Sequence, residues 1–371
     1  MKHTLSKIDR RWIWIVLAGG IILSRMLLAG RPDLIEQYYS RGLFPWIRLL
    51  LDWTIALLPF PFLYLIILLL LAGIVRLVFL WRRPNQKPVL QRFMSFLLSL
   101  LCAVGLIVGS FLLLWGFNYS RIPFEDQVQI DPRALSKAEL KTELELLTTS
   151  LITTRQAISD VDTNALDASY IEADLRQAIH DLVIENVQSL GYPTPGHPVC
   201  RFLYPKGSLL RISTAGFYLP FTGECHVDPG LHPIQLPFVI AHELHHAYGF
   251  TDEGTCNFLA YLACIRSKDP FIRYCGQFGY WNYLRSNFRV GQKEAYRDYW
   301  NQLPRGLRAD RIAVSEQMQK YPDILPDVRD LIYGSYLKAQ GISEGLQNYS
   351  RIILLAHAWR QKQQKAQKNP R

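Results

Sequence analysis

The segment Phe238-Val-Ile-Ala-His-Glu-Leu-His-His246 brings together residue types that bind metals and transfer protons. His242 and His246 are four residues apart, so on an α-helix their imidazoles lie on one face and can share a metal ion. Glu243 follows the first histidine and can reach a metal-bound water as a general base. This is the H-E-x-x-H pattern of zinc hydrolases, and the apolar run before it is typical of a buried helix. The alternative is an ordinary amphipathic helix that carries three histidines. His245 points away from the other two histidines in either case.

A catalytic zinc site needs a third protein ligand, and Glu253 is placed to supply it. On one continuous helix, Glu253 would lie roughly 10 Å further along the axis than His246, which is too far. The helix must therefore end between them, and Gly249 is placed to end it. A second helix is expected to begin near Glu253 and to run through TCNFLAYLACIRS. Asn257 lies one turn later on the same face and could orient a metal-bound imidazole by a hydrogen bond.

Asp252 competes with Glu253 for the role of third ligand. It lies six residues after His246, where the pattern H-E-x-x-H-x-x-G-x-x-H places a histidine, and Gly249 also fits that pattern. Glu253 is the favoured choice. The alternative role for Glu253 is that of an acid that interacts favourably with the dipole at a helix start.

Several stretches beyond these positions resemble an uncharacterised family of bacterial membrane proteins with a gluzincin-like metallopeptidase domain. The resemblance covers most of the chain. It rests on H-E-L-H-H with the following G-F-T-D-E-G-T-C-N-F-L-A-Y-L-A-C, W-G-F-N-Y-S-R from Trp115, G-F-Y-L-P-F-T-G-E from Gly216, R-Y-C-G from Arg273 and Y-L-K-A-Q-G-I-S-E-G from Tyr336. It implies peptidase chemistry, with Glu253 and Asn257 matching the gluzincin E-x-x-x-D/N pattern. Two features depart from that pattern: the gap before Glu253 is much shorter than usual, and Thr255 and Cys256 stand where Glu and Ala are expected.

These residues predict metal-assisted hydrolysis of a peptide or a related amide. Zn²⁺ held by His242, His246 and Glu253 would acidify its bound water and polarise the scissile carbonyl. Glu243 would take the water proton and pass it to the leaving amine. Two other functions stay open: a non-catalytic, membrane-tethered zinc-binding sensor or interaction module, and an amide hydrolase that acts on cell-wall peptides.

An oxyanion stabiliser and a substrate-binding strand are expected beside the metal. Tyr274 and His226 are candidates for the stabiliser, and a structural role is the alternative for each. The strand-like segment 209–221 could bind an extended peptide by edge pairing.

The amino-terminal third of the chain is expected to anchor this site to a membrane. Three apolar runs, residues 12–30, 54–81 and 93–117, are each long enough to cross a bilayer as a helix. A cleaved signal peptide is the alternative for the first run, although no clear A-x-A site follows it. Pro59 and Pro61 lie in the first turns of the second run, where a kink or a later helix start is tolerable.

The net charge of +10 lies wholly in this anchor. Residues 1–121 hold 14 of the 41 basic residues but only 4 of the 31 acids, so the remaining chain is electrically neutral. This distribution argues against nucleic-acid binding. Basic residues cluster before the first run and between the second and third, which the positive-inside rule assigns to the cytoplasm. Three crossings then place residues 122–371 on the outer face of the cell membrane, and the loss of one span would reverse this.

Residues 122–371 form the second predicted domain. Helices are expected from Ala134 to about Leu190, with a capping box formed by Ser136 and Glu139, and again from Leu236 onward. Residues 191–233, rich in Gly and Pro, predict short strands and loops. The fold class is therefore a mainly α membrane protein, with three transmembrane helices followed by an α-rich, α+β zincin-like metallopeptidase domain with a small β-sheet.

The six cysteines include no C-x-x-C pair, so a cysteine zinc cluster is not expected. An outer-face location permits disulfides, and Cys200–Cys225 is the most plausible pair.

Overall fold

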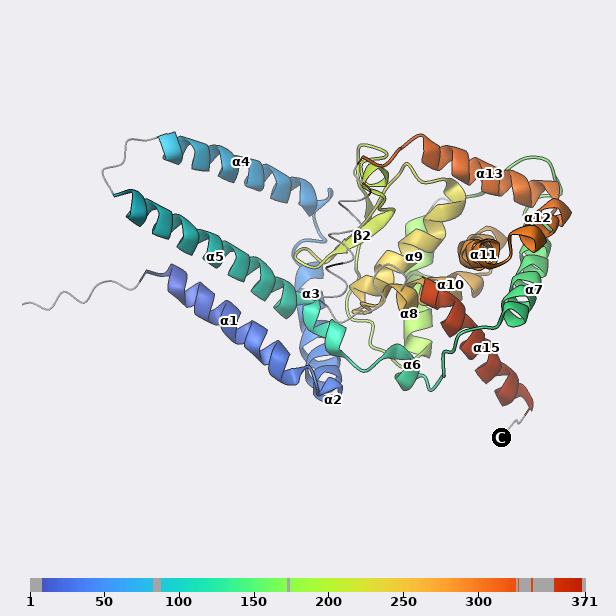
Figure 1. Ribbon diagram of the computed structural model, residues 1–371, viewed down its shortest axis with the longest axis horizontal. Helices are drawn as coiled ribbons and strands as arrows, with labels where there is room; N and C mark the ends of the chain where they lie inside the picture. Colours follow the sequence, from blue (N-terminus) through green and yellow to red (C-terminus); the bar gives the residue numbers. More distant parts are fainter. Residues whose placement is uncertain are drawn as a thin grey trace, which may run out of the picture. The chain divides into compact units, whose positions relative to one another are not determined.

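The computed structural model describes residues 9–82, 88–171, 174–324 and 350–368, together with Pro326 and Ser335 (Figure 1). The chain is mainly helical with one small mixed sheet, which confirms the prediction at that level. It divides into two compact units: residues 1–121 with 220–223, and residues 122–219 with 224–371. The late segment from Tyr336 that contributed to the family resemblance lies outside the described residues.

Two helices of the first unit, α1 (Arg11–Leu28) and α5 (Val89–Leu114), pack along each other (Figure 1). The contact runs through small residues, because a Cβ added at Gly105 would lie 3.1 Å from that of Ala18, and one at Gly109 would lie 3.4 Å from it. In the described part of the chain, these are the two helices that are long and apolar enough to cross a membrane. They support membrane association of the protein.

The second predicted span differs from the expectation. Its helix, α4 (Phe62–Arg82), begins eight residues later than the predicted Thr54, and its described apolar part, Phe62–Arg76, is shorter than the other two. The prediction of three spanning helices is therefore corrected to two candidates among the described residues. Pro59 and Pro61 account for the later start of α4, because they lack a backbone N–H and disfavour helical dihedrals in the residue before them. Short elements complete the unit: α2 (Pro32–Leu34), the π-helix η1 (Ile35–Leu43), α3 (Phe44–Asp52) and the 3₁₀ turn η2 (Gly116–Ser120).

The second unit opens with the short α6 (Phe124–Gln127) and the long α7 (Lys137–Gln156). The predicted capping box at the start of α7 is confirmed, since Ser136 accepts from the Glu139 N–H and Glu139 accepts from the Ser136 N–H. After η3 (Ala168–Tyr170), the chain forms α8 (Leu175–Ser189), which packs on the two helices of the motif.

A three-stranded sheet follows, in the region where strands and loops were predicted. It consists of β1 (Cys200–Phe202), β2 (Gly216–Leu219) and β3 (Glu224–Val227) in the order β1-β3-β2. The central β3 pairs in parallel with β1 and antiparallel with β2. The 3₁₀ turns η4 (Leu210–Ile212) and η5 (Pro233–Gln235) lie in the connections. The sheet packs against the next helix, α9 (Leu236–Ala247).

The core of this unit surrounds α9 and α10 (Glu253–Ile265). Ten of the 12 residues of α9 and 11 of the 13 residues of α10 are buried. The helices that enclose them include α8, α11 (Pro270–Gly291) and α15 (Ile352–Lys368). Helices α12 (Lys293–Gln302) and α13 (Arg305–Gln319) follow α11 in sequence and lie at the periphery of this unit (Figure 1). Both motif helices are therefore held on most sides, which restricts how their side chains can move.

Candidate metal centre

The chain reverses direction between the two halves of the motif. Helix α9 ends at Ala247, and Gly249 follows with a φ of +87°, a left-handed conformation that glycine adopts without strain. Helix α10 then begins at Glu253. The predicted break at Gly249 and the predicted second helix are both confirmed, and the turn brings the start of α10 back beside the last two turns of α9.

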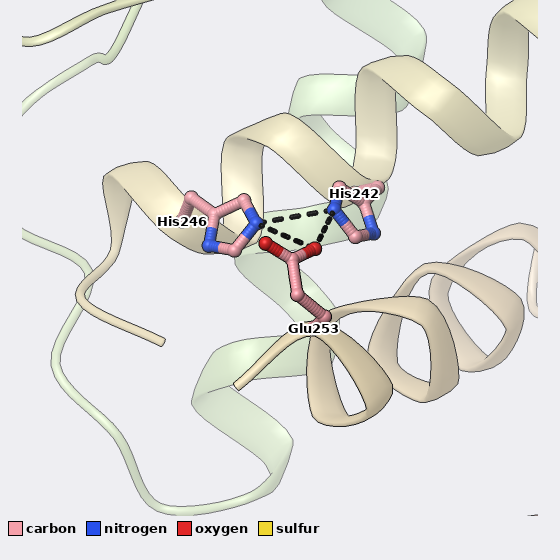
Figure 2. A group of neighbouring side chains, drawn as sticks. All are labelled: His242, His246 and Glu253. Carbon is pink, nitrogen blue, oxygen red and sulfur yellow. Dashed lines mark hydrogen bonds and ion pairs between the residues drawn. The ribbon is translucent and has the colours of Figure 1, made fainter. Parts of the chain in front are cut away.

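The side chains of His242, His246 and Glu253 meet at this turn (Figure 2). The Nε2 atoms of the two histidines are 3.1 Å apart, and Oε2 of Glu253 lies 3.2 Å from that of His242 and 3.6 Å from that of His246. All three residues are at most 9% exposed. In the residues that the structure describes, this is the one group of three potential ligands that converge in this way. The buried His–His–Glu triad can bind a metal ion.

Hydrogen bonds orient the ligating atoms. Nδ1 of His246 lies 2.8 Å from the carbonyl oxygen of Phe250, so this nitrogen donates to the turn and leaves Nε2 directed at the triad. The thiol of Cys256 lies 3.4 Å from the same Nδ1. Burial alone would lower the pKa of His246, but Cys256 and Glu253 raise it well above its usual value.

Asp252, the alternative ligand, is engaged at the start of α10. Its Oδ1 accepts hydrogen bonds from the backbone N–H and the hydroxyl of Thr255, both at 2.7 Å. Its Oδ2 lies 3.2 Å from the guanidinium of Arg351. Asp252 thus caps the helix, while Glu253, one residue later, is the acid that the structure brings to the histidines.

The carboxyl group of Glu243 is buried between α9 and the sheet. A Cβ at Gly216 on β2 would lie 2.9 Å from Oε1 of Glu243, while Oε2 has no hydrogen-bond partner among the described residues. Burial raises the pKa of Glu243 to about 7, although the neighbouring His242 and His246 act to lower it. A carboxyl group that titrates near neutral pH can both accept and return a proton.

Asn257 has a partner that sequence reasoning missed. Its side chain hydrogen-bonds to Tyr283 on α11, whose hydroxyl also lies close enough to interact with the charge of Glu253. Burial raises the pKa of Tyr283, so the hydroxyl keeps its proton at neutral pH. Position 283 carries no motif and is remote in sequence, so only the packing of α11 on α10 reveals it.

The two proposed oxyanion stabilisers contact residues outside the triad. Tyr274 donates to the buried Asp310 at 2.5 Å, within a cluster that includes Arg155. His226, on β3, is fully buried with its ring stacked on Phe217. In the described part of the protein, neither side chain has a hydrogen bond to a member of the triad. Both therefore lie in environments that fit the structural alternative considered for them.

All six cysteines are free, so the Cys200–Cys225 disulfide is absent. The two residues are register neighbours on the parallel strands β1 and β3, but the thiol of Cys225 donates to the backbone oxygen of Glu243 at 3.1 Å. This bond directs the sulfur of Cys225 at α9. Spacing alone could not reveal that preference.

Comparison with known proteins identifies a family. A family model described as "Protein of unknown function (DUF3810)" matches residues 39–356, which is most of the chain. No curated protein and no solved structure matches the sequence.

Proposed function

The chain belongs to this family of proteins of unknown function, and from that premise we propose that it is a membrane-anchored, zinc-dependent peptidase. The observation that carries the proposal is the triad of His242, His246 and Glu253, buried between α9 and the start of α10, whose charges interact with the carboxyl group of Glu243. A zincin-like domain of the gluzincin type is the fold that this arrangement favours.

The spacing of the triad fits zinc. Ligand atoms about 2.0–2.2 Å from a tetrahedral ion lie roughly 3.3–3.6 Å from one another. The three separations here are 3.1, 3.2 and 3.6 Å, so one ion could contact all three atoms after small side-chain movements. Two imidazoles and one carboxylate are a ligand set typical of zinc. Three protein ligands also leave a fourth position for water or substrate, which is typical of catalytic rather than structural sites.

Each residue then has a defined part in hydrolysis. His242, His246 and Glu253 would hold the ion, which when bound supplies Lewis acidity for a water molecule and for the scissile carbonyl. Glu243 takes the proton of the attacking water on its carboxylate and returns it to the nitrogen of the leaving amine. Oε2 of Glu243 has no partner among the described residues, which supports this role, because a buried polar atom of this kind is expected to bind water or substrate.

The proposal places the second unit on the outer face of the cell membrane. The basic residues between the second and third apolar runs support this, because they assign the start of α5 to the cytoplasm, and one crossing by α5 then carries the following chain to the outer face. Labelling of a cysteine introduced at the exposed Asp160 with a membrane-impermeant reagent in intact cells tests the orientation. Labelling only after lysis would contradict it.

Full-length protein in detergent tests the enzymatic function. We expect about one zinc per chain by elemental analysis, and cleavage of a fluorogenic peptide library that a chelator abolishes and added zinc restores. Replacement of Glu243 by Gln should leave zinc bound and abolish cleavage, because the amide cannot accept the proton. Zinc without turnover on any peptide pool would favour a non-catalytic zinc-binding module. Turnover of cell-wall peptides alone would favour the more specialised amide hydrolase.

A further inference from the structure

Asn186, on α8, is fully buried and contacts both helices of the metal centre, α9 and α10. We propose that Asn186 and His245 together fix the position of α9 against α10 and so set the geometry of the metal site. Neither residue would be a ligand; both would be positioning residues. The inference rests on the proposed function, because it concerns the same metal site.

The first link joins α8 to α9. His245 is 0% exposed, and its Nδ1 lies 2.6 Å from the carbonyl oxygen of Ala241 in the preceding turn. Because Nδ1 donates to that oxygen, Nε2 carries a lone pair and accepts a hydrogen bond. The Nδ2 of Asn186 lies 3.3 Å from it. The ring of His245 is thus held at both nitrogens.

The second link joins α8 to α10. The same Nδ2 of Asn186 lies 3.3 Å from the carbonyl oxygen of Leu259. A side-chain amide has two N–H hydrogens, so it can donate one to His245 and one to Leu259. Because the carbonyl oxygen of Leu259 can only accept a hydrogen bond, the atom of Asn186 that faces it must be the amide nitrogen. A single amide group therefore ties both motif helices to a third helix.

The hydrogen bonds of Asn186 matter for the metal site because the two histidines lie on α9 and Glu253 lies on α10. His245 directly precedes His246 on α9, and Leu259 lies six residues after Glu253 on α10. The distances of 3.2 and 3.6 Å between Glu253 and the histidines therefore depend on how α9 lies against α10. A rotation of α9 about its axis would move both imidazoles away from the carboxylate.

The composition of the link argues that its role is geometric. Burying an amide is unfavourable unless its hydrogen bonds are satisfied, and Oδ1 of Asn186 has no partner among the described residues. An apolar side chain of similar size would remove this unsatisfied oxygen, which offsets part of the cost of leaving Nε2 of His245 without its donor. Directional bonds, in contrast, specify one arrangement of the helices, which apolar contacts do less strictly.

Full-length protein in detergent, with Asn186→Leu, separates the two roles. We expect the zinc Kd from chelator competition to rise about 10- to 100-fold, the range seen when groups that orient metal ligands are lost. The absorption spectrum of the cobalt-substituted protein should change, while the unfolding midpoint of the metal-free protein should fall only slightly, because the loss of the unsatisfied Oδ1 offsets part of the lost hydrogen bond. The matched control is Gln188→Leu, an exposed position on the same helix. It should change neither the zinc Kd nor the absorption spectrum of the cobalt-substituted protein.

His245→Gln and the double variant complete the experiment. If the two residues act through one hydrogen bond, the zinc Kd of the double variant should be no higher than the higher of the two single-variant Kd values. His245→Gln also serves if the leucine variant does not fold. A zinc Kd within twofold of wild type in either single variant, or a loss of affinity that only follows a loss of stability, would overturn the inference. Failure of the proposed function looks different: the wild-type protein would then bind no zinc, or would bind zinc without cleaving any peptide, and the second outcome leaves this inference intact.

Discussion

Gly216 on β2 lies directly against the carboxyl group of Glu243 on α9, so that a Cβ at this position would be 2.9 Å from Oε1. The same Cβ would lie 2.7 Å from the backbone oxygen of His226 on the neighbouring strand β3. The backbone cannot move away easily, since β2 is paired to β3 at this point. The absence of a side chain at position 216 is therefore what allows the carboxyl group to lie here.

Replacement of Gly216 by Ala should displace Glu243 and impair catalysis. We expect kcat/KM on a cleaved peptide to fall at least about tenfold, and the overpacked strand to cost roughly 1–3 kcal/mol of stability. Zinc affinity should change little, because Glu243 is not among the three converging ligands. Gly291→Ala is the control, since nothing lies within 4 Å of its Cβ position. Full activity in Gly216→Ala would show that the base tolerates displacement.

Paired variants should distinguish the two acids at the start of α10. Glu253→Gln removes the negative ligand beside the histidines and is expected to weaken zinc binding by at least about 100-fold. Asp252→Ala removes the helix cap and the contact with Arg351, so it should cost about 1 kcal/mol or more of stability but leave zinc bound. Both are measured by chelator competition and thermal unfolding. The reverse pattern of zinc affinities would identify Asp252 as the ligand.

Acid should destabilise the second unit through His226. Burial lowers the pKa of this histidine to about 4, with a further contribution from Arg201, whereas the unfolded residue titrates near 6.5. The unfolded chain therefore binds the extra proton first, so the stability that the neutral ring confers is complete above pH 6.5 and is lost as the pH falls towards 4. Between pH 6.5 and 5 the free energy of unfolding should fall by roughly 1.5 kcal/mol from this residue.

His226→Phe tests this contribution, because phenylalanine can still stack on Phe217 but does not titrate. Urea unfolding of both proteins at pH 6.5 and pH 5 should show a smaller loss in the variant. Other buried histidines, such as His245, contribute equally to both proteins and cancel in the difference. An identical loss in the two proteins would mean that His226 is not the residue that takes up the proton.

Asp228 should stabilise the loop that leads into β2. It is fully buried and accepts four backbone hydrogen bonds, at 2.7 to 3.1 Å, from Gly207, Leu209, Leu210 and Gly230. Asp228→Asn puts an N–H₂ group where N–H donors converge, and we expect it to lower the free energy of unfolding by roughly 2–4 kcal/mol. Asp160→Asn, at an exposed position, provides the reference. Equal stability of the two variants in urea would contradict the assigned role.

Local features of the fold followed from the sequence because they depend on neighbouring residues. The capping box of Ser136 and Glu139 and the helix end at Gly249 are of this kind, since each is determined within one turn of the chain. The start of α4 at Phe62 has an equally local cause, since Pro59 and Pro61 lie in the first turns of the apolar run, where a later helix start is tolerable. The run 54–81 is as apolar as expected, but α4, which begins at Phe62, is shorter than the predicted helix.

The sequence by itself determined which residues of this protein could bind a metal, because the four-residue spacing of His242 and His246 places them on one face of any helix. It also identified Glu253 as the favoured third acid, but Asp252 remained open. Tertiary structure made that distinction: Arg351 and Thr255 engage Asp252, and the turn at Gly249 carries Glu253 to the histidines. Gly216, Tyr283 and Asn186 could be recognised only in the folded chain, because their roles arise from contacts between segments far apart in sequence, which no local pattern encodes.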